Sequence, residues 1–111
     1  MELVEEVLGR VVVVTARGRL DGSTSQAFSA RLETLAKGSE PRLVVDFSGI
    51  DFVSSAGLRV VLSLLKRVKA ANGMLALCAL QAPVKEVLEI TGFMGMLAVH
   101  AGRAEAVAAL A

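Results

Sequence analysis

The sequence has little or none of several residue types that would indicate particular classes of protein. Its single cysteine, Cys78, excludes an internal disulfide and a cysteine-based zinc site. Trp and Tyr are absent and aromatic residues make up only 4%, so the predicted core is built from Val, Leu and Ala. The net charge of +1 indicates neither nucleic acid nor an anionic membrane as a partner.

Long apolar runs and a basic leader are also missing. No run approaches the roughly 20 apolar residues that a membrane-spanning helix needs. The chain opens with an acidic stretch, residues 1–6, where a secretory signal would be basic. We therefore expect a cytoplasmic protein that does not insert directly into a membrane.

The usual signatures of catalysis and metal binding do not occur. A serine hydrolase would need a base such as histidine beside its nucleophile. His100 is the only histidine, and the nucleophile motif Gly-x-Ser-x-Gly is absent. The segment 22–25, Gly-Ser-Thr-Ser, lacks the Gly-Lys-Ser/Thr core of a phosphate-binding loop. Histidines and acidic residues do not recur at the spacing of a metal site. The sequence therefore predicts a protein that is not an enzyme and that uses no metal or cofactor.

The apolar pattern of the first third predicts a hairpin followed by a helix. Residues 3–8 and 11–16 read as two strands joined by the tight turn Gly9-Arg10. A helix follows and stops at Lys37-Gly38. Ser23 and Gln26 have the spacing of a capping box at its start.

The remainder alternates between strands and helices. Gly92 closes a helix that Pro83 begins. The other predicted elements are strands at 43–47, 74–80 and 97–100 and helices at about 56–71 and 104–111. The whole chain, residues 1–111, is therefore expected to form one α/β domain. Its mixed sheet has four to five strands, opens with an antiparallel hairpin and is covered by about four helices.

The segment from Asp46 to Leu62, Asp-Phe-Ser-Gly-Ile-Asp-Phe-Val-Ser-Ser-Ala-Gly-Leu-Arg-Val-Val-Leu, places two serines at the start of a helix. A serine hydroxyl there can cap the helix, act as a nucleophile or accept a phosphate. Further along, the spacing predicts an inward-facing stripe and leaves Val60 and Leu64 either in the core or at the edge of a partner surface. The predicted stripe consists of Leu58, Val61, Leu62, Leu65 and Val68.

This segment resembles the signature of the STAS domain, and specifically that of bacterial anti-sigma-factor antagonists. Three further stretches match the family in order and with its spacing, so the resemblance covers essentially the whole chain. They are Gly-Arg-Leu-Asp at 18–21, Asn-Gly-Met-Leu-Ala-Leu-Cys-Ala-Leu at 72–80 and Pro-Val-Lys-Glu-Val-Leu-Glu-Ile-Thr-Gly-Phe at 83–93.

The resemblance implies a partner switch. In this family the unphosphorylated antagonist binds an anti-sigma factor that is also a serine kinase of the GHKL type, and thereby frees the sigma factor. The kinase then phosphorylates the motif serine, which matches Ser55, and the complex separates. A metal-dependent phosphatase removes the phosphate. By the same matching, the partner-binding residues are Asp21, Ser54, Ser55, Ala56, Gly57 and Arg59.

The chain departs from the family pattern at two positions and leaves alternatives open. Many members have an aspartate where Ser54 stands and a second hydroxyl residue where Ala56 stands. Two adjacent serines result, so Ser54 is an alternative phosphate acceptor to Ser55. The alternative function is that of a STAS subunit that binds the ATPase of an ABC-type lipid transport complex, or a STAS scaffold in another signalling assembly.

Overall fold

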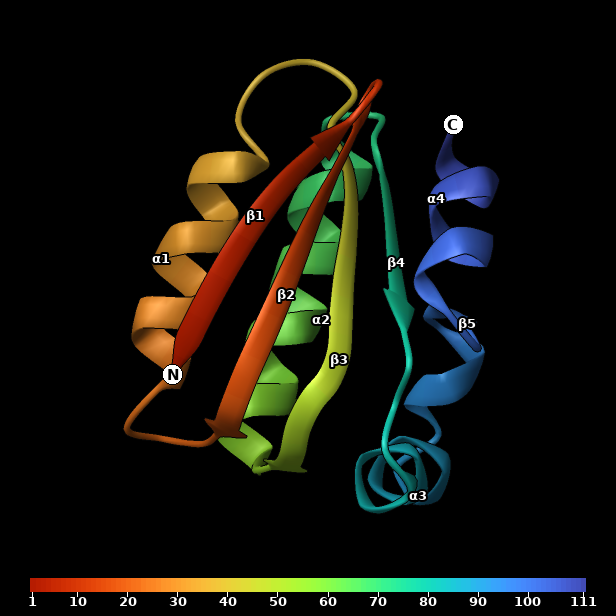
Figure 1. The fold of residues 1–111 in the computed structure, drawn as a ribbon. Helices are drawn as coiled ribbons and strands as arrows, with labels where there is room; N and C mark the ends of the chain where they lie inside the picture. Colours follow the sequence, from red (N-terminus) through yellow and green to blue (C-terminus); the bar gives the residue numbers. More distant parts are fainter.

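The computed structural model describes residues 1–111, which form one five-stranded sheet (Figure 1). The strands lie in the order β1-β2-β3-β4-β5, with β1 antiparallel to β2 and every other pair parallel. The mixed sheet and the antiparallel hairpin predicted from the sequence are therefore confirmed. The strands are β1 (Glu2–Leu8), β2 (Val11–Leu20), β3 (Arg42–Val53), β4 (Met74–Cys78) and β5 (Ala98–His100).

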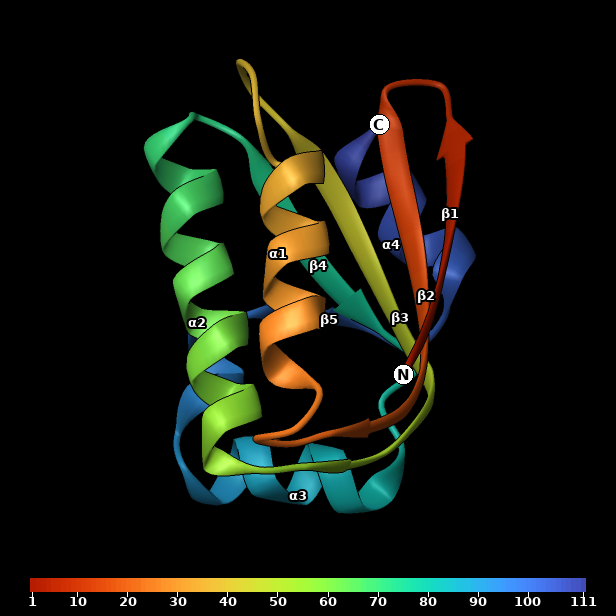
Figure 2. The same ribbon diagram turned by 90° about the vertical axis from the view of Figure 1, so that its left-hand side faces the viewer.

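Four α-helices surround the sheet, and a short 3₁₀ turn, η1 (Phe93–Gly95), precedes β5. Helices α1 and α2 lie side by side on one face, and α3 crosses the end of the molecule where β2 and β3 finish (Figure 2). Helix α4 lies on the opposite face (Figure 1). The helices are α1 (Ser25–Leu35), α2 (Ser55–Ala70), α3 (Ala82–Ile90) and α4 (Arg103–Leu110). None of them is both long and apolar enough to pass through a lipid bilayer.

The core is divided by the sheet into two unequal clusters. The larger holds 21 buried residues between the sheet and helices α1, α2 and α3, whereas the smaller holds 7 residues beneath α4. Along β3, Leu43, Val45 and Phe47 belong to the larger cluster and Val44 to the smaller one. Strand β3 is apolar at successive positions because both of its faces are covered.

Helix α2 confirms most of the predicted inward stripe. Leu58, Val61 and Leu65 are buried as expected, and Leu64 joins the core. Val60 is partly buried and packs against the same cluster. The prediction for Leu62 is wrong, because one residue beyond Val61 turns the helix by about 100° and brings Leu62 to the outer side, where it stays half-exposed.

The structure also corrects the start of α1. The capping box of Ser23 and Gln26 does not form, because the Ser23 hydroxyl donates a hydrogen bond to Asp21 Oδ1 at 2.7 Å. Thr24 is the N-cap instead, and its hydroxyl donates to the Arg19 carbonyl at 2.6 Å. The aspartate side chain thus organises a local turn that competes with helix capping.

Strands β2 and β3 continue past their predicted ends. The predicted limits were residues 16 and 47, but the two strands pair in parallel until Leu20 lies opposite Val53. The ladder is irregular near Gly49, where a Cβ atom would come within 2.9 Å of the Ala16 carbonyl oxygen. The extension matters because it brings the ends of both strands to the start of α2.

A polar clamp compensates for the small apolar cluster beneath α4. The Arg103 guanidinium donates to Asp46 Oδ2 and to Glu6 Oε1, both at 3.1 Å, and also to the Thr15 hydroxyl. One side chain of α4 therefore contacts β1, β2 and β3. Asp46 also accepts a hydrogen bond from the Ser48 N–H at 2.8 Å. Burial raises the pKa of Asp46, but hydrogen bonds from Ser48 and Arg103 outweigh that effect and hold the pKa below its ordinary value.

We expect Asp46→Asn to lower the free energy of unfolding by about 1–3 kcal/mol at pH 7, because Arg103 would lose a charged acceptor. The folded-state pKa of Asp46 is depressed, so its stabilisation is complete above the unfolded-state pKa of about 3.9 and is lost as the pH falls through the folded value. Urea denaturation at pH 7 and pH 3 should show the two proteins converging in acid. Asp51→Asn, at an exposed position, is the control. Equal stability of wild type and Asp46→Asn at pH 7 would contradict the clamp.

Candidate functional site

The two serines of the motif have different structural roles. Ser54 is the N-cap of α2: its backbone is extended, with φ −88° and ψ 176°, and its Oγ accepts a hydrogen bond from the Gly57 N–H at 3.2 Å. Its own N–H donates to the Leu20 carbonyl at 2.9 Å. The hydroxyl and the backbone of Ser54 are thus both used to attach the start of α2 to the end of β2.

Ser55 is the first residue of α2, and its side chain is exposed. No hydrogen bond within the protein involves its hydroxyl. The backbone N–H groups of a first helical turn attract negative charge, yet the first turn of α2 contains no acidic side chain. Ser55 therefore presents a free hydroxyl at a position that favours an anion.

Gly57 permits the close approach of α2 to β2. A Cβ atom at this position would lie 2.6 Å from the Leu20 carbonyl oxygen and 2.8 Å from Leu20 Cγ. Ala56, which replaces a hydroxyl residue of the family pattern, is half-buried and small. Residue 57 must therefore be glycine so that α2 can pack closely on β2. The sequence had predicted only that Gly57 contacts a partner.

Asp21 lies beside the start of α2, because Leu20 accepts the hydrogen bond from Ser54. Its Oδ1 accepts hydrogen bonds from the hydroxyl and the N–H of Ser23, at 2.7 and 2.9 Å. The Ser23 hydroxyl is the largest influence holding the pKa of Asp21 below its ordinary value, so Asp21 is ionised at neutral pH. The carboxylate is fixed within its own loop and makes no hydrogen bond to Ser55.

Arg19 and Phe52 belong to the same end of the molecule and were missed by the sequence analysis. The Arg19 guanidinium lies over the Phe52 ring, 4.2 Å from its centroid, and its Nε is 3.7 Å from Asp21 Oδ2. Phe52 is 38% exposed, whereas Phe28 and Phe47 are buried in the core. No local sequence pattern indicated the pair, because the two residues meet only through the parallel register of β2 and β3, in which they lie opposite each other.

The predicted site residues are therefore gathered at one end of the sheet. Figure 2 shows the ends of β2 and β3 meeting the start of α2 above α3. Arg59 is exposed one helical turn beyond Ser55. The surface formed by Asp21, Ser54, Ser55, Ala56, Gly57 and Arg59, together with Arg19 and Phe52, is called the switch surface below.

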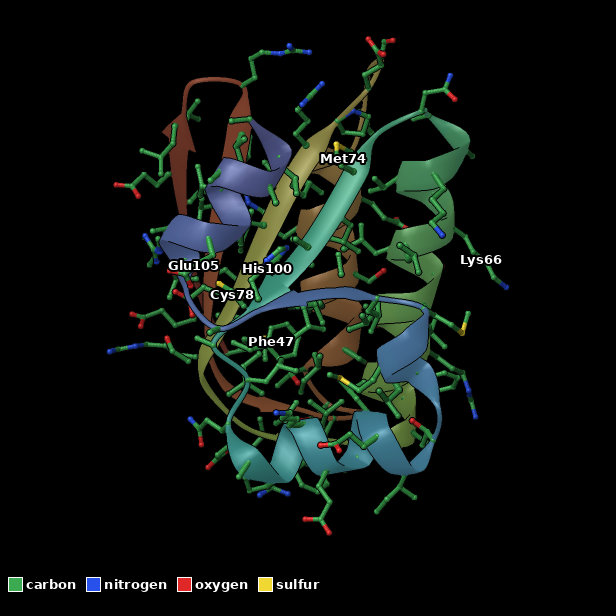
Figure 3. All side chains as sticks on the ribbon, turned by 90° about the vertical axis from the view of Figure 1, so that its right-hand side faces the viewer. Phe47, Lys66, Met74, Cys78, His100 and Glu105 are labelled. Atoms are coloured by element: carbon green, nitrogen blue, oxygen red, sulfur yellow. The ribbon has the colours of Figure 1, made fainter.

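Cys78 and His100 lie away from the switch surface, opposite each other where β4 pairs with β5 (Figure 3). Cys78 is buried, and desolvation raises the pKa of its thiol to about 11, so the thiol is protonated. His100 is half-buried. The structure contains no group of three His, Cys, Asp or Glu side chains placed to hold a metal ion.

We expect Gly57→Ala to lower the free energy of unfolding by about 1–3 kcal/mol, because the added methyl group would push α2 away from Leu20. Gly22→Ala is a matched control, since a Cβ at residue 22 has no heavy atom within 4 Å; its effect should be below about 0.5 kcal/mol. Thermal unfolding followed by circular dichroism measures both. Equal melting temperatures for the two variants would show that the approach at Gly57 is not constrained.

Comparison with known proteins agrees with this architecture. Residues 2–106 match the STAS domain. BtrV of Bordetella bronchiseptica, named as a candidate anti-sigma factor antagonist, is 34% identical over 109 residues, which make up 98% of this chain and 94% of that protein.

Two solved structures share the fold. A Thermotoga maritima protein, also described as a candidate anti-sigma factor antagonist, superposes with a TM-score of 0.91 at 17% identity, over 97% of this chain and 93% of its own. The Bacillus cell fate determinant SpoIIAA in its phosphorylated form gives a TM-score of 0.75 at 21% identity, over 99% of this chain and 100% of its own. The matched domain and the 34% identity over nearly the full length show that the chain belongs to the STAS domain family.

Proposed function

We propose that this protein is an anti-sigma-factor antagonist that changes partners through phosphorylation of Ser55. Its unphosphorylated form binds an anti-sigma factor that is also a GHKL-type serine kinase, and so frees the sigma factor. The proposal is supported by the family, by the name of the 34% identical relative and by the geometry at the start of α2. The protein itself is not an enzyme in this scheme and acts in the cytoplasm.

The observation that carries the proposal is the division of labour between the two serines. Ser54 is occupied as a helix cap, whereas Ser55 is exposed with a free hydroxyl. A kinase can reach the Ser55 oxygen without dismantling the contact between α2 and β2. This geometry favours Ser55 over Ser54 as the acceptor.

The covalent step transfers the γ-phosphoryl group of ATP to the Ser55 oxygen, and ADP and a proton leave. The kinase supplies the nucleotide, the magnesium and the catalysis. A metal-dependent phosphatase then hydrolyses the phosphoserine, which restores the hydroxyl and releases inorganic phosphate. No cofactor of this chain takes part.

A phosphate on Ser55 would release the partner by changing the charge and the shape of the switch surface. It adds about −1.5 to −2 charges at neutral pH, which the N–H groups of the first turn of α2 can accommodate within the domain. In a packed interface the same group adds bulk and must lose its water. A penalty of about 3–4 kcal/mol would weaken binding more than a hundredfold. The domain therefore need not refold to release its partner.

The other residues of the switch surface have roles in partner binding. Asp21 offers a fixed, ionised carboxylate in the loop that follows β2, and Arg59 offers a cation one turn along α2 from Ser55. Ala56 is small and half-buried, so a partner backbone can approach closely there, whereas Gly57 is buried against Leu20 and serves the packing of α2 on β2. The transporter-subunit alternative is supported by no feature beyond the fold.

We expect incubation with the cognate GHKL kinase and ATP to add one phosphate to the wild type and none to Ser55→Ala. Ser54→Ala should still accept a phosphate, but it should lose about 1 kcal/mol of stability because α2 loses its cap. Mass spectrometry of the intact proteins and thermal unfolding give the two readouts. One phosphate on both wild type and Ser55→Ala would overturn the assignment.

Arg59→Glu should weaken binding of the unphosphorylated protein to the kinase about tenfold or more, because it reverses a charge beside the acceptor serine. Its melting temperature should stay near that of the wild type, since Arg59 is exposed and forms no ion pair. Isothermal titration calorimetry measures the affinity. Unchanged affinity would remove Arg59 from the interface.

A further inference from the structure

Two adjoining hollows run along the outer side of α1 and α2. The first is lined by Ser29 of α1 and by Arg59, Leu62, Ser63 and Lys66 of α2. The second lies between the ends of the two helices, and its lining includes Lys37, Gly38 and Arg67. Ser63 and Lys66 line both hollows. The two neighbouring hollows are together called the α1–α2 groove below.

The α1–α2 groove is strongly basic. Four cations line it: Lys37, Arg59, Lys66 and Arg67. Helix α2 contains four basic residues and no acidic one, although the whole chain has a net charge of only +1. The only nearby anion in an ion pair is Glu33, whose Oε1 lies 3.7 Å from the Arg67 Nε.

Helix stability explains only part of this charge. Basic residues in the last turn of α2, Arg67 and Lys69, offset the negative end of the helix dipole. Arg59 and Lys66 lie outside that turn, and neither forms an ion pair. Lys66 points outward from α2, away from the sheet (Figure 3). These two cations are left free to meet negative charge on another molecule.

The chemistry of the groove selects the kind of molecule. Single-stranded nucleic acid would need aromatic side chains for base stacking, and the groove has none. Stable insertion into an anionic membrane would need large exposed apolar side chains in addition to the basic residues. The apolar residues Val60 and Leu62 in the groove are only half-exposed. The large apolar residues that are exposed lie elsewhere: Met1, Val4, Val7, Leu8, Phe52, Met74, Ile90 and Met96. Small residues such as Gly38 and Ser63 leave room for a polypeptide.

We propose that the α1–α2 groove docks an acidic stretch of the same kinase that phosphorylates Ser55. This inference rests on the proposed function and extends the interface from the switch surface along α2. Arg59 belongs to both surfaces, so one partner can cover them together. The far end of the groove, at Lys37 and Arg67, lies at the opposite end of α2 from Ser55. The attraction between these cations and the acidic stretch therefore acts mainly on the rate at which the partner associates. Phosphorylation of Ser55 leaves this attraction unchanged.

The test is the rate of association between the purified cognate kinase and the unphosphorylated full chain, measured by stopped flow at several salt concentrations. We expect Lys66→Glu to slow association about tenfold at low ionic strength and Lys66→Gln about threefold. Both differences should shrink as salt increases, and the dissociation rate should change less. Arg10→Glu, in the exposed turn between β1 and β2, is the matched charge reversal and should associate like wild type. Circular dichroism checks that every variant is folded.

The outcomes separate this inference from the proposed function. If the kinase binds the wild type and Lys66→Glu with equal rates and equal salt dependence, the groove is not a docking site, while the switch at Ser55 stands. If the kinase neither binds nor phosphorylates the wild type, the proposed function itself fails. Co-sedimentation with phosphatidylglycerol vesicles that requires Lys66, with unchanged kinase association, would overturn the proposal in favour of a membrane surface.

Discussion

The hydrogen bond from the Ser54 N–H to the Leu20 carbonyl fixes where α2 begins, and the switch surface is built around it. Gly57 lets the helix approach the same carbonyl without a clash. Because β2 and β3 end side by side there, the loop that carries Asp21 and the stacked pair of Arg19 and Phe52 come to the same place. A single backbone contact thus brings together residues from two strands and a helix.

The two faces of the sheet depend on different forces. On the α1–α2 face, a large apolar cluster that includes Phe28 and Phe47 supports the helices, so their outer sides are free to carry charge. On the other face, α4 covers a much smaller cluster and is held by the ionic contacts of Arg103. The buried carboxylate of Asp46 belongs to the same strand that leads to the switch surface. The segment that begins at Asp46 therefore contributes to stability through that residue and to the proposed regulation through Ser55.

Most of the fold could be predicted from the sequence because the chain follows local rules consistently. The order of strands and helices, the hairpin and the limits of α2 all follow from apolar spacing and turn residues. The predictions were wrong where contacts between distant parts of the chain determine the structure. Ser23 bonds to Asp21 and so cannot cap α1, and β3 continues to Val53 because β2 continues beside it. The contact of Arg19 with Phe52 depends on parallel register, which no local pattern reveals.

Separate residues cap the helix and offer the free hydroxyl, and this has a consequence for inheritance. A lesion that removes the hydroxyl at Ser55 leaves the cap at Ser54 intact, so the protein should accumulate to normal levels. Under the proposed switch, such an allele would stay in its binding form and be dominant, because the altered protein would continue to occupy the kinase. A lesion at Ser54 would instead reduce abundance and be recessive. Adjacent codons of one motif would thus give opposite genetic behaviour.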